Sequence, residues 1–114
     1  MTVSTHVLDA SLGTPAAGVS VTLSRLAAGW LDVESGVTGP DGRHRFVGDT
    51  PAGTYCLTFS TGVYFAARAV PTFYPEVAIT FTITEPEDAA DGNVGHVHVP
   101  LLLSPFAYST YRGT

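Results

Sequence analysis

The feature that most constrains the fold is an alternation of apolar and polar residues that recurs along the chain. Val19, Val21 and Leu23 alternate with serine and threonine, and the segment 78–84, AITFTIT, repeats the pattern. Successive side chains of a strand point to opposite faces, so a period of two predicts antiparallel strands with one buried face.

Six further segments have the composition of strands, and turn signals separate them. These segments are 3–9, 30–36, 42–47, 54–60, 95–102 and 106–112. Glycine and proline mark turns, for example at 13–15 and 40–42. The acidic stretch 85–93 is expected to be a solvated loop, and 64–70, YFAARAV, is the one predicted helix, ended by Pro71. Seven or eight short strands at this spacing predict an all-β sandwich or barrel of antiparallel sheets.

Length and charge narrow the class of protein. Residues 1–114 are expected to form one domain with a core that needs no disulfide. The five basic residues, all arginines, stand against ten acidic ones, which argues against nucleic acid and anionic membranes as partners. With no basic-then-apolar leader and no apolar run of membrane-spanning length, the expected location is the cytoplasm. Cys56, the one cysteine, is expected to be a small buried residue.

The segment 95–102, GHVHVPLL, combines an apolar face with two histidines. Alternation places Val97 and Val99 toward the core and His96 and His98 on the opposite face. Pro100 cannot donate a ladder hydrogen bond, which predicts an edge strand or a bulge. Outward histidines admit three interpretations: solvated residues, a subunit contact, or ligands of a metal such as zinc.

A zinc site needs one or two ligands beyond the His-x-His pair. Only His6 and His44 remain, and no cysteine or carboxylate stands at a ligand-like spacing. No metal site is therefore predicted. No nucleophile elbow, phosphate loop or paired-carboxylate motif is present either, so pattern and composition alone do not identify the chemistry.

Four stretches together resemble the 5-hydroxyisourate hydrolase family, which is related in sequence and fold to transthyretin. They are residues 4–23, 39–46, 73–81 and 96–114. The most specific is the ending Tyr111-Arg112-Gly113-Thr114, which is similar to a tyrosine-arginine-glycine-serine ending that transthyretins lack. The resemblance covers essentially the whole chain. It implies an all-β, transthyretin-like (prealbumin-like) sandwich of two antiparallel sheets with one short helix.

The same resemblance implies an assembly and a reaction. Subunits are expected to pair edge to edge, and dimers to pair into a homotetramer with active sites in the clefts between dimers. The expected reaction opens the ring amide of 5-hydroxyisourate to give 2-oxo-4-hydroxy-4-carboxy-5-ureidoimidazoline, a step of urate degradation in purine catabolism. It is expected to need no metal and no organic cofactor.

Residue by residue, the resemblance assigns His6, Arg43 and His98 to catalysis, and His6, Arg43, Tyr111 and Thr114 to substrate binding. Thr114 replaces the usual serine but keeps a hydroxyl. Histidine suits proton transfer because its unperturbed pKa is about 6.5. Arginine stays charged and presents a planar fork of donors to urate-like oxygens.

Several alternatives stay open at this point. Either His6 or His98 can be the general base, and His96 is expected to lie outside direct contact with substrate. The chain can also be a transthyretin-like protein that binds a small molecule without catalysis, or a structural sandwich module of a larger assembly.

Overall fold

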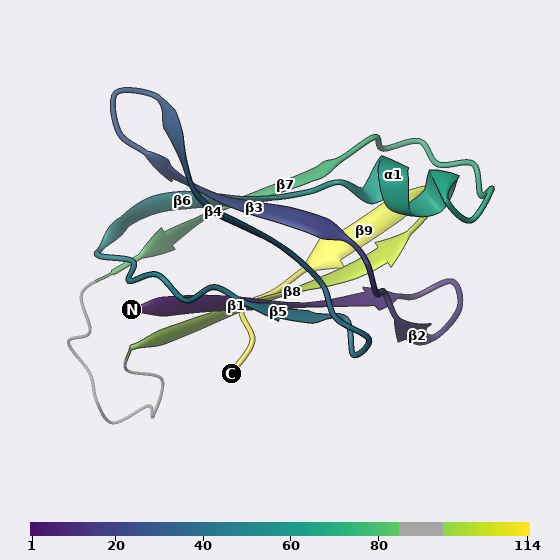
Figure 1. The fold of residues 1–114 in the computed structure, drawn as a ribbon, viewed down its shortest axis with the longest axis horizontal. Coiled ribbons are helices and arrows are strands. Elements are labelled where there is room, and N and C mark those ends of the chain that lie inside the picture. The colour runs from purple at the N-terminus through teal and green to yellow at the C-terminus, as the bar shows by residue number, and fades with distance from the viewer. Residues whose placement is uncertain (85–94) are drawn as a thin grey trace.

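The computed structural model describes residues 1–84 and 95–114, which form two β-sheets stacked face to face (Figure 1). The elements are β1 (Thr2–Asp9), β2 (Thr14–Pro15), β3 (Ser20–Leu26), β4 (Trp30–Val37), β5 (Arg43–Arg45), β6 (Gly53–Phe59), α1 (Thr61–Ala66), β7 (Val77–Ile83), β8 (His96–Ser104) and β9 (Ala107–Thr110). The predicted sandwich is confirmed, with nine strands in the described part instead of seven or eight. The loop predicted at 85–93 lies outside the described residues.

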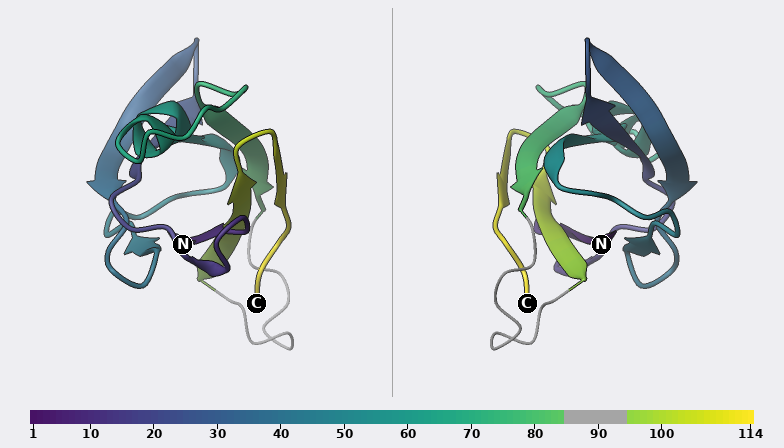
Figure 2. Two further views of the ribbon diagram at one scale, coloured as in Figure 1. Left: turned by 90° about the vertical axis from the view of Figure 1, so that its right-hand side faces the viewer. Right: turned by 90° about the vertical axis from the view of Figure 1, so that its left-hand side faces the viewer.

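The first sheet contains β1, β2, β5, β8 and β9, and the second has the order β4-β3-β6-β7. End-on views show the two layers enclosing one interior (Figure 2). β1 pairs with β8 along its whole length, and this pair is parallel. The expectation of purely antiparallel sheets is therefore wrong for this pair. Side-chain alternation has the same period in both orientations, so the pattern could not distinguish them.

The core forms where the predicted apolar faces meet. Val3 and Val7 of β1 are fully buried, as are Leu57 and Phe59 of β6. On β8 the alternation is obeyed, since Val97 and Val99 are buried while the histidines lie on the outer face. Burial of these faces is the main stabilising contribution, at roughly 25 cal/mol for each Å² of apolar surface.

Pro100 lies inside the first sheet, because β8 pairs with β1 on one side and β9 on the other. The β8–β9 ladder stops at the Leu101–Thr110 pair and resumes as a bridge between His98 and Gly113. Pro100, which has no backbone N–H to donate, lies in this gap. Its carbonyl accepts a hydrogen bond from Thr110 Oγ1 at 2.7 Å. The prediction of an edge strand or a bulge is wrong in both alternatives, because β8 is an interior strand and its pairing with β9 keeps the same register on both sides of the gap.

Two local predictions need correction. Residues 13–15, predicted as a turn, include the two-residue strand β2, which pairs with Leu8 and Asp9. The helix begins at Thr61 and ends at Ala66, earlier than predicted. It ends because Ala69 adopts a left-handed conformation (φ 56°) and its N–H bonds back to the Ala66 carbonyl. This is a Schellman-type end, formed before Pro71 is reached.

A buried carboxylate joins α1 to the end of β1. Asp9 is 1% exposed and accepts hydrogen bonds from the N–H and hydroxyl of Ser11 and, at 2.8 Å, from the hydroxyl of Tyr64. Burial and this bond to Asp9 raise the pKa of Tyr64 to about 12. The charge of Asp9 is thus satisfied by donors from two elements, as a buried carboxylate requires.

Two further observations concern the class of protein. Cys56 is a buried, unpaired thiol, as predicted. No helix in the described part of the chain is long and apolar enough to cross a membrane.

Candidate active site

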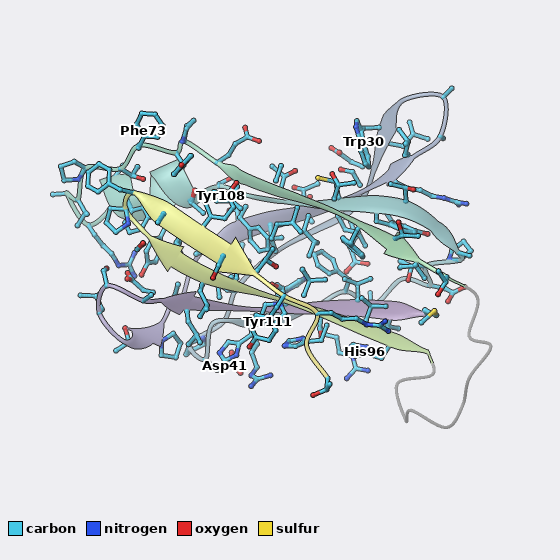
Figure 3. The ribbon with its side chains drawn as sticks, turned by 180° about the vertical axis from the view of Figure 1, so that it is seen from behind. Trp30, Asp41, Phe73, His96, Tyr108 and Tyr111 are labelled. Carbon is cyan, nitrogen blue, oxygen red and sulfur yellow. The ribbon has the colours of Figure 1, made fainter. Side chains whose placement is uncertain are left out.

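The candidate residues from three strands meet on the outer face of the first sheet. In the β1–β5 ladder His6 stands opposite Arg43, and Ser4 stands opposite Arg45. In the β1–β8 ladder Ser4 stands opposite His98. Because paired residues of neighbouring strands share a face, His6, His96, His98 and both arginines lie on one polar surface. Figure 3 shows His96 and Asp41 on this same side.

A cavity of about 350 Å³ opens on this surface. Its lining residues are Ser4, Thr5, Asp41, Arg43, His44, Arg45, His96, His98 and Thr114. The structure thus brings three predicted residues, Arg43, His98 and Thr114, to one cavity. His6 is not part of the lining, but it is the neighbour of Arg43 in the ladder.

A tight turn positions Arg43 at the cavity. Asp41 Oδ1 accepts the backbone N–H of Arg43 at 3.0 Å, and the Gly42 N–H donates to the Gly39 carbonyl. Gly42 has φ 77°, and a Cβ there would come within 2.3 Å of the Val7 carbonyl oxygen. Only glycine fits both the conformation and the space, so the aspartate-glycine turn fixes where β5 begins.

His98 is partly buried and held on one side. Its Nδ1 lies 2.7 Å from Ser4 Oγ. Burial lowers the pKa of His98 below its usual range, and the charges of Arg43, His96 and His6 lower it further. Its imidazole is therefore neutral at neutral pH, which is the state required of a general base.

The chain end packs directly on His98. The Gly113 N–H donates to the His98 carbonyl at 2.9 Å. A Cβ at Gly113 would lie 2.5 Å from His98 Cδ2, closer than any side chain tolerates. Glycine is required here so that the backbone can lie against the imidazole and carry Thr114 into the cavity.

Tyr111 is not brought to this cavity. It is 57% exposed and lines a second cavity, of about 280 Å³, beside β7. The residues around that cavity include Ile79, Phe81 and Val99. Within one chain, Tyr111 thus lines a different cavity from Arg43, His98 and Thr114.

Six of the cavity residues were not predicted as site residues, and Ser4, Arg45 and His96 are the three that bear on the chemistry. Ser4 bonds both His96 and His98, and Arg45 brings a second cation. His96, expected outside direct substrate contact, lines the cavity and is hydrogen-bonded to Ser4 at 2.8 Å. The alternation places Ser4 on the face of His6, but only the β1–β8 register reveals its partners.

His44 faces a different environment from the other histidines. It packs edge to face on Phe46, with ring centroids 4.6 Å apart, and its Nε2 is buried without a hydrogen-bond partner among the described residues. Over residues 1–84 and 95–114, no three histidine, cysteine or acidic side chains are grouped closely enough to hold a metal ion.

Comparison with known proteins places these residues in a family. The model of the HIUase/Transthyretin family matches residues 3–113. The 5-hydroxyisourate hydrolase of Mus musculus is 43% identical over 117 residues, covering 96% of this chain and 92% of that protein. The structure of Klebsiella pneumoniae 5-hydroxyisourate hydrolase is 40% identical with a TM-score of 0.84, covering 100% of both chains.

A transthyretin structure is equally close in shape. Transthyretin from Sparus aurata has a TM-score of 0.86 at 32% identity, covering 97% of this chain and 95% of that one. The fold is therefore the transthyretin-like sandwich that the resemblance implied. Since the family match spans nearly the whole sequence and the similarity to hydrolases extends over both full chains, this chain belongs to the HIUase/Transthyretin family.

Proposed function

We propose that residues 1–114 form one domain that hydrolyses 5-hydroxyisourate, opening its ring amide to give 2-oxo-4-hydroxy-4-carboxy-5-ureidoimidazoline in urate degradation. The observation that carries the proposal is the cavity in which Arg43, His98 and Thr114 meet beside His6. The relatives from mouse and Klebsiella pneumoniae carry the name of this hydrolase.

The reaction needs a base for water, stabilisation of the developing oxyanion, and a proton for the leaving ring nitrogen. We assign the proton transfers to His98 and His6, because the imidazole is the side chain suited to proton transfer near neutral pH. The environment of His98 favours the neutral form, because burial and three neighbouring cationic or titratable side chains lower its pKa.

Arg43 is assigned to substrate orientation and to the oxyanion. A guanidinium presents a planar fork of donors that fits urate-like oxygens, and it cannot lose its proton. Arg45 lines the same cavity, so two of the five arginines of this acidic chain gather here. In a site that excludes water, such a charge can lower the barrier by several kcal/mol.

The hydroxyl or carboxylate of Thr114 is assigned to placing the attacking water. Tyr111 is assigned to substrate binding in a cleft completed by a second subunit, since within one chain it lies at the other cavity. We therefore propose a homotetramer, a dimer of dimers. Exposed aromatic side chains near β9, among them Phe106 and Tyr108, support a subunit contact on that side.

No redox cofactor is proposed, because hydrolysis transfers no electrons, and no step is assigned to a metal. Activity is expected to survive dialysis against EDTA. We also propose that the enzyme acts in the cytoplasm, which fractionation of expressing cells followed by the activity assay would test.

The alternative is a transthyretin-like protein that binds a small molecule without catalysis. The favouring observation is the shape, since the transthyretin TM-score of 0.86 is no lower than the hydrolase value of 0.84. The polar residues of the first cavity favour the hydrolase. A cavity that only binds a small molecule needs no neutral histidine such as His98 beside Arg43, whereas the hydrolase uses both.

One experiment separates the two functions. Purified protein is added to freshly made 5-hydroxyisourate, and decay is followed by ultraviolet absorbance. The hydrolase predicts a decay rate proportional to protein concentration, whereas a binding protein leaves the spontaneous rate unchanged or slows it. Light scattering on the active sample tests the tetramer, and a fully active single chain would contradict a shared site.

A further inference from the structure

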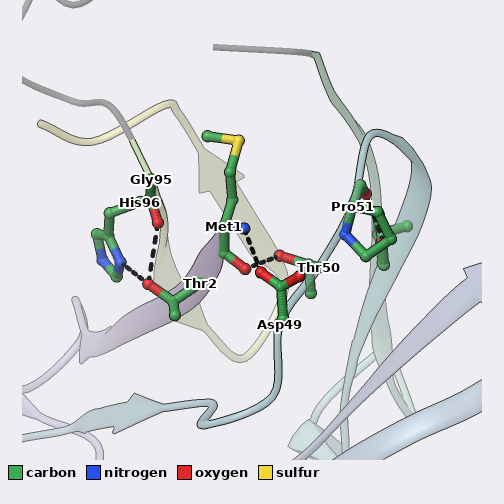
Figure 4. Close-up of polar contacts among 8 residues, drawn as sticks. Met1, Thr2, Asp49, Thr50, Pro51, Gly95 and His96 are labelled. Carbon is green, nitrogen blue, oxygen red and sulfur yellow. Dashed lines mark hydrogen bonds and ion pairs between the residues drawn. The ribbon is translucent and has the colours of Figure 1, made fainter.

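Four hydrogen bonds form a chain along the outer face of the first sheet. Thr2 Oγ1 lies 3.2 Å from the Gly95 carbonyl oxygen and 2.7 Å from His96 Nδ1 (Figure 4). On the other side of the ring, His96 Nε2 lies 2.8 Å from Ser4 Oγ, which in turn lies 2.7 Å from His98 Nδ1. The chain therefore starts at a backbone carbonyl and ends at the imidazole assigned to proton transfer.

The carbonyl at the start gives the chain a direction. A carbonyl oxygen only accepts, so the Thr2 hydroxyl is the donor in its 3.2 Å bond to Gly95, whose carbonyl also accepts the Thr2 N–H at 2.8 Å. Thr2 Oγ1 must then accept from His96 Nδ1–H. A neutral imidazole has one N–H, so His96 Nε2 accepts the hydroxyl hydrogen of Ser4.

The last bond follows from the others. Ser4 has spent its hydrogen on His96, so its oxygen accepts from His98 Nδ1–H. A neutral His98 then carries its lone pair on Nε2, the nitrogen that Ser4 does not occupy. The opposite direction would leave the Thr2 hydroxyl without its bond to the carbonyl and would place the hydrogen of His98 on Nε2.

These bonds have this direction only while His96 is neutral, since an imidazolium would donate from both nitrogens. Two observations support the neutral form. His96 is partly buried between hydroxyls on both sides. Burial lowers the pKa of His96, and the nearby guanidinium of Arg45 lowers it further.

We propose that Thr2, His96 and Ser4 are positioning residues that hold His98 as the Nδ1–H tautomer and so make His98 Nε2 the general base. The inference rests on the proposed hydrolase function, and it assigns the base between the two candidate histidines. In the step, water loses a proton to His98 Nε2 while its oxygen bonds to the ring carbonyl carbon. The ring C–N bond then breaks, and the proton is returned to the leaving nitrogen.

The direct test is the tautomer of His98 in the unaltered protein. Nitrogen-15 NMR of labelled imidazoles distinguishes a protonated from an unprotonated ring nitrogen. At neutral pH we expect His98 Nδ1 to be protonated and Nε2 to be unprotonated. A protonated Nε2 with a bare Nδ1 would overturn the proposal. Because this readout does not use substrate, it stands apart from the test of the proposed function.

Variants test the catalytic consequence. Ser4→Ala removes the acceptor for Nδ1–H, and it is expected to lower kcat by about 10- to 100-fold with little change in KM, a loss typical of residues that orient a functional histidine. Ser4→Thr keeps a hydroxyl at this position of β1, so its kcat should recover most of what Ser4→Ala loses. Ser35→Ala is the matched control, since Ser35 Oγ bonds Thr22 Oγ1 at 3.1 Å on the second sheet.

Thr2→Val keeps the shape of the side chain but removes the start of the chain, and it serves if Ser4→Ala does not fold. In this variant His98 should be a mixture of the two tautomers, and the kcat of the enzyme should be lower. A purely structural role for these hydroxyls would lower stability and leave the tautomer and kcat of folded enzyme unchanged, which would overturn the proposal. A wild-type protein without hydrolase activity would instead refute the proposed function, whatever the tautomer.

Discussion

The outer faces of the two sheets obey the same alternation but have different chemistry. On the second sheet Thr22 bonds Ser35 across β3 and β4, and β4 also exposes apolar side chains such as Trp30 and Val37. On the first sheet the outward hydroxyl of Ser4 bonds two imidazoles, and the neighbouring strand brings Arg43 and Arg45. The second face thus mixes hydroxyls with apolar side chains, whereas the first joins imidazoles to guanidinium groups.

The difference shows what a polar face needs in order to become a site. Alternation alone makes a surface that water can cover, as on the second sheet. The first sheet adds a concave lining, two cations and the chain end, whose Gly113 packs on His98. Partial burial then lowers the pKa of His96 and His98 and favours their neutral forms.

The largest effect is expected at His98. In His98→Asn the side-chain amide can still bond Ser4, but nothing replaces Nε2, so turnover should fall at least ~100-fold, the low end for a general base. Steady-state decay of 5-hydroxyisourate measures it. Thr58→Val, at an outward position of β6 on the second sheet, should leave turnover unchanged. Near-normal turnover in His98→Asn would transfer the base role to His6.

A smaller loss is expected for Arg43→Lys. An ammonium keeps the charge but cannot replace the planar fork, so kcat/KM should fall about tenfold, equivalent to about 1.4 kcal/mol of transition-state stabilisation. Arg25→Lys, on β3 of the second sheet, is the matched control. Equal effects of the two substitutions would contradict a special role for the first face.

The pH dependence tests the environment of His98. The charged or titratable side chains that act on it are Arg43, His96 and His6, and the cavity lining also includes Asp41, Arg45 and Thr114. Since burial lowers the pKa of His98, the neutral base should persist below pH ~6.5, and kcat/KM should fall about tenfold per pH unit only below that lowered pKa. A pH–rate profile that already declines between pH 8 and 7 would contradict this environment.

The smallest effect on turnover is expected for Tyr64→Phe, far from the histidines. It removes one donor to the buried carboxylate of Asp9 and should lower the free energy of unfolding by about 1–3 kcal/mol. Chemical denaturation measures the loss, and turnover per folded molecule should stay at the wild-type level. A comparable loss of turnover would mean that the two ends of the sandwich are coupled.

The sequence predicted the faces of the strands but not how the strands meet. Alternation correctly assigned Val97 and Val99 to the core, because it depends only on local geometry. The parallel β1–β8 pair and the interior position of Pro100 depend on segments from opposite ends of the chain. No local pattern contains that pairing.

The residues of the candidate site also divide into those that the sequence predicted and those that depend on how the strands pair. Arg43 could be placed from its turn and the family resemblance, and His98 from alternation and the same resemblance. Ser4 could not, since outward serines and threonines are common on both sheets and only the register gives it two imidazole partners. Tyr111 lies at another cavity of the single chain, so its assigned role depends on the proposed assembly.

The central claim is that substrate binds the outer face of the first sheet, and a titration tests it most directly. Urate, a stable relative of the proposed substrate, is added to isotopically labelled protein while two-dimensional NMR spectra are recorded. We expect the chemical shifts of His98 and Arg43 to change in a saturable way, whereas those of Thr22 on the second sheet should stay the same. Binding on this face would be contradicted if chemical shifts changed only around the second cavity, at Ile79 and Phe81, while those of His98 stayed the same.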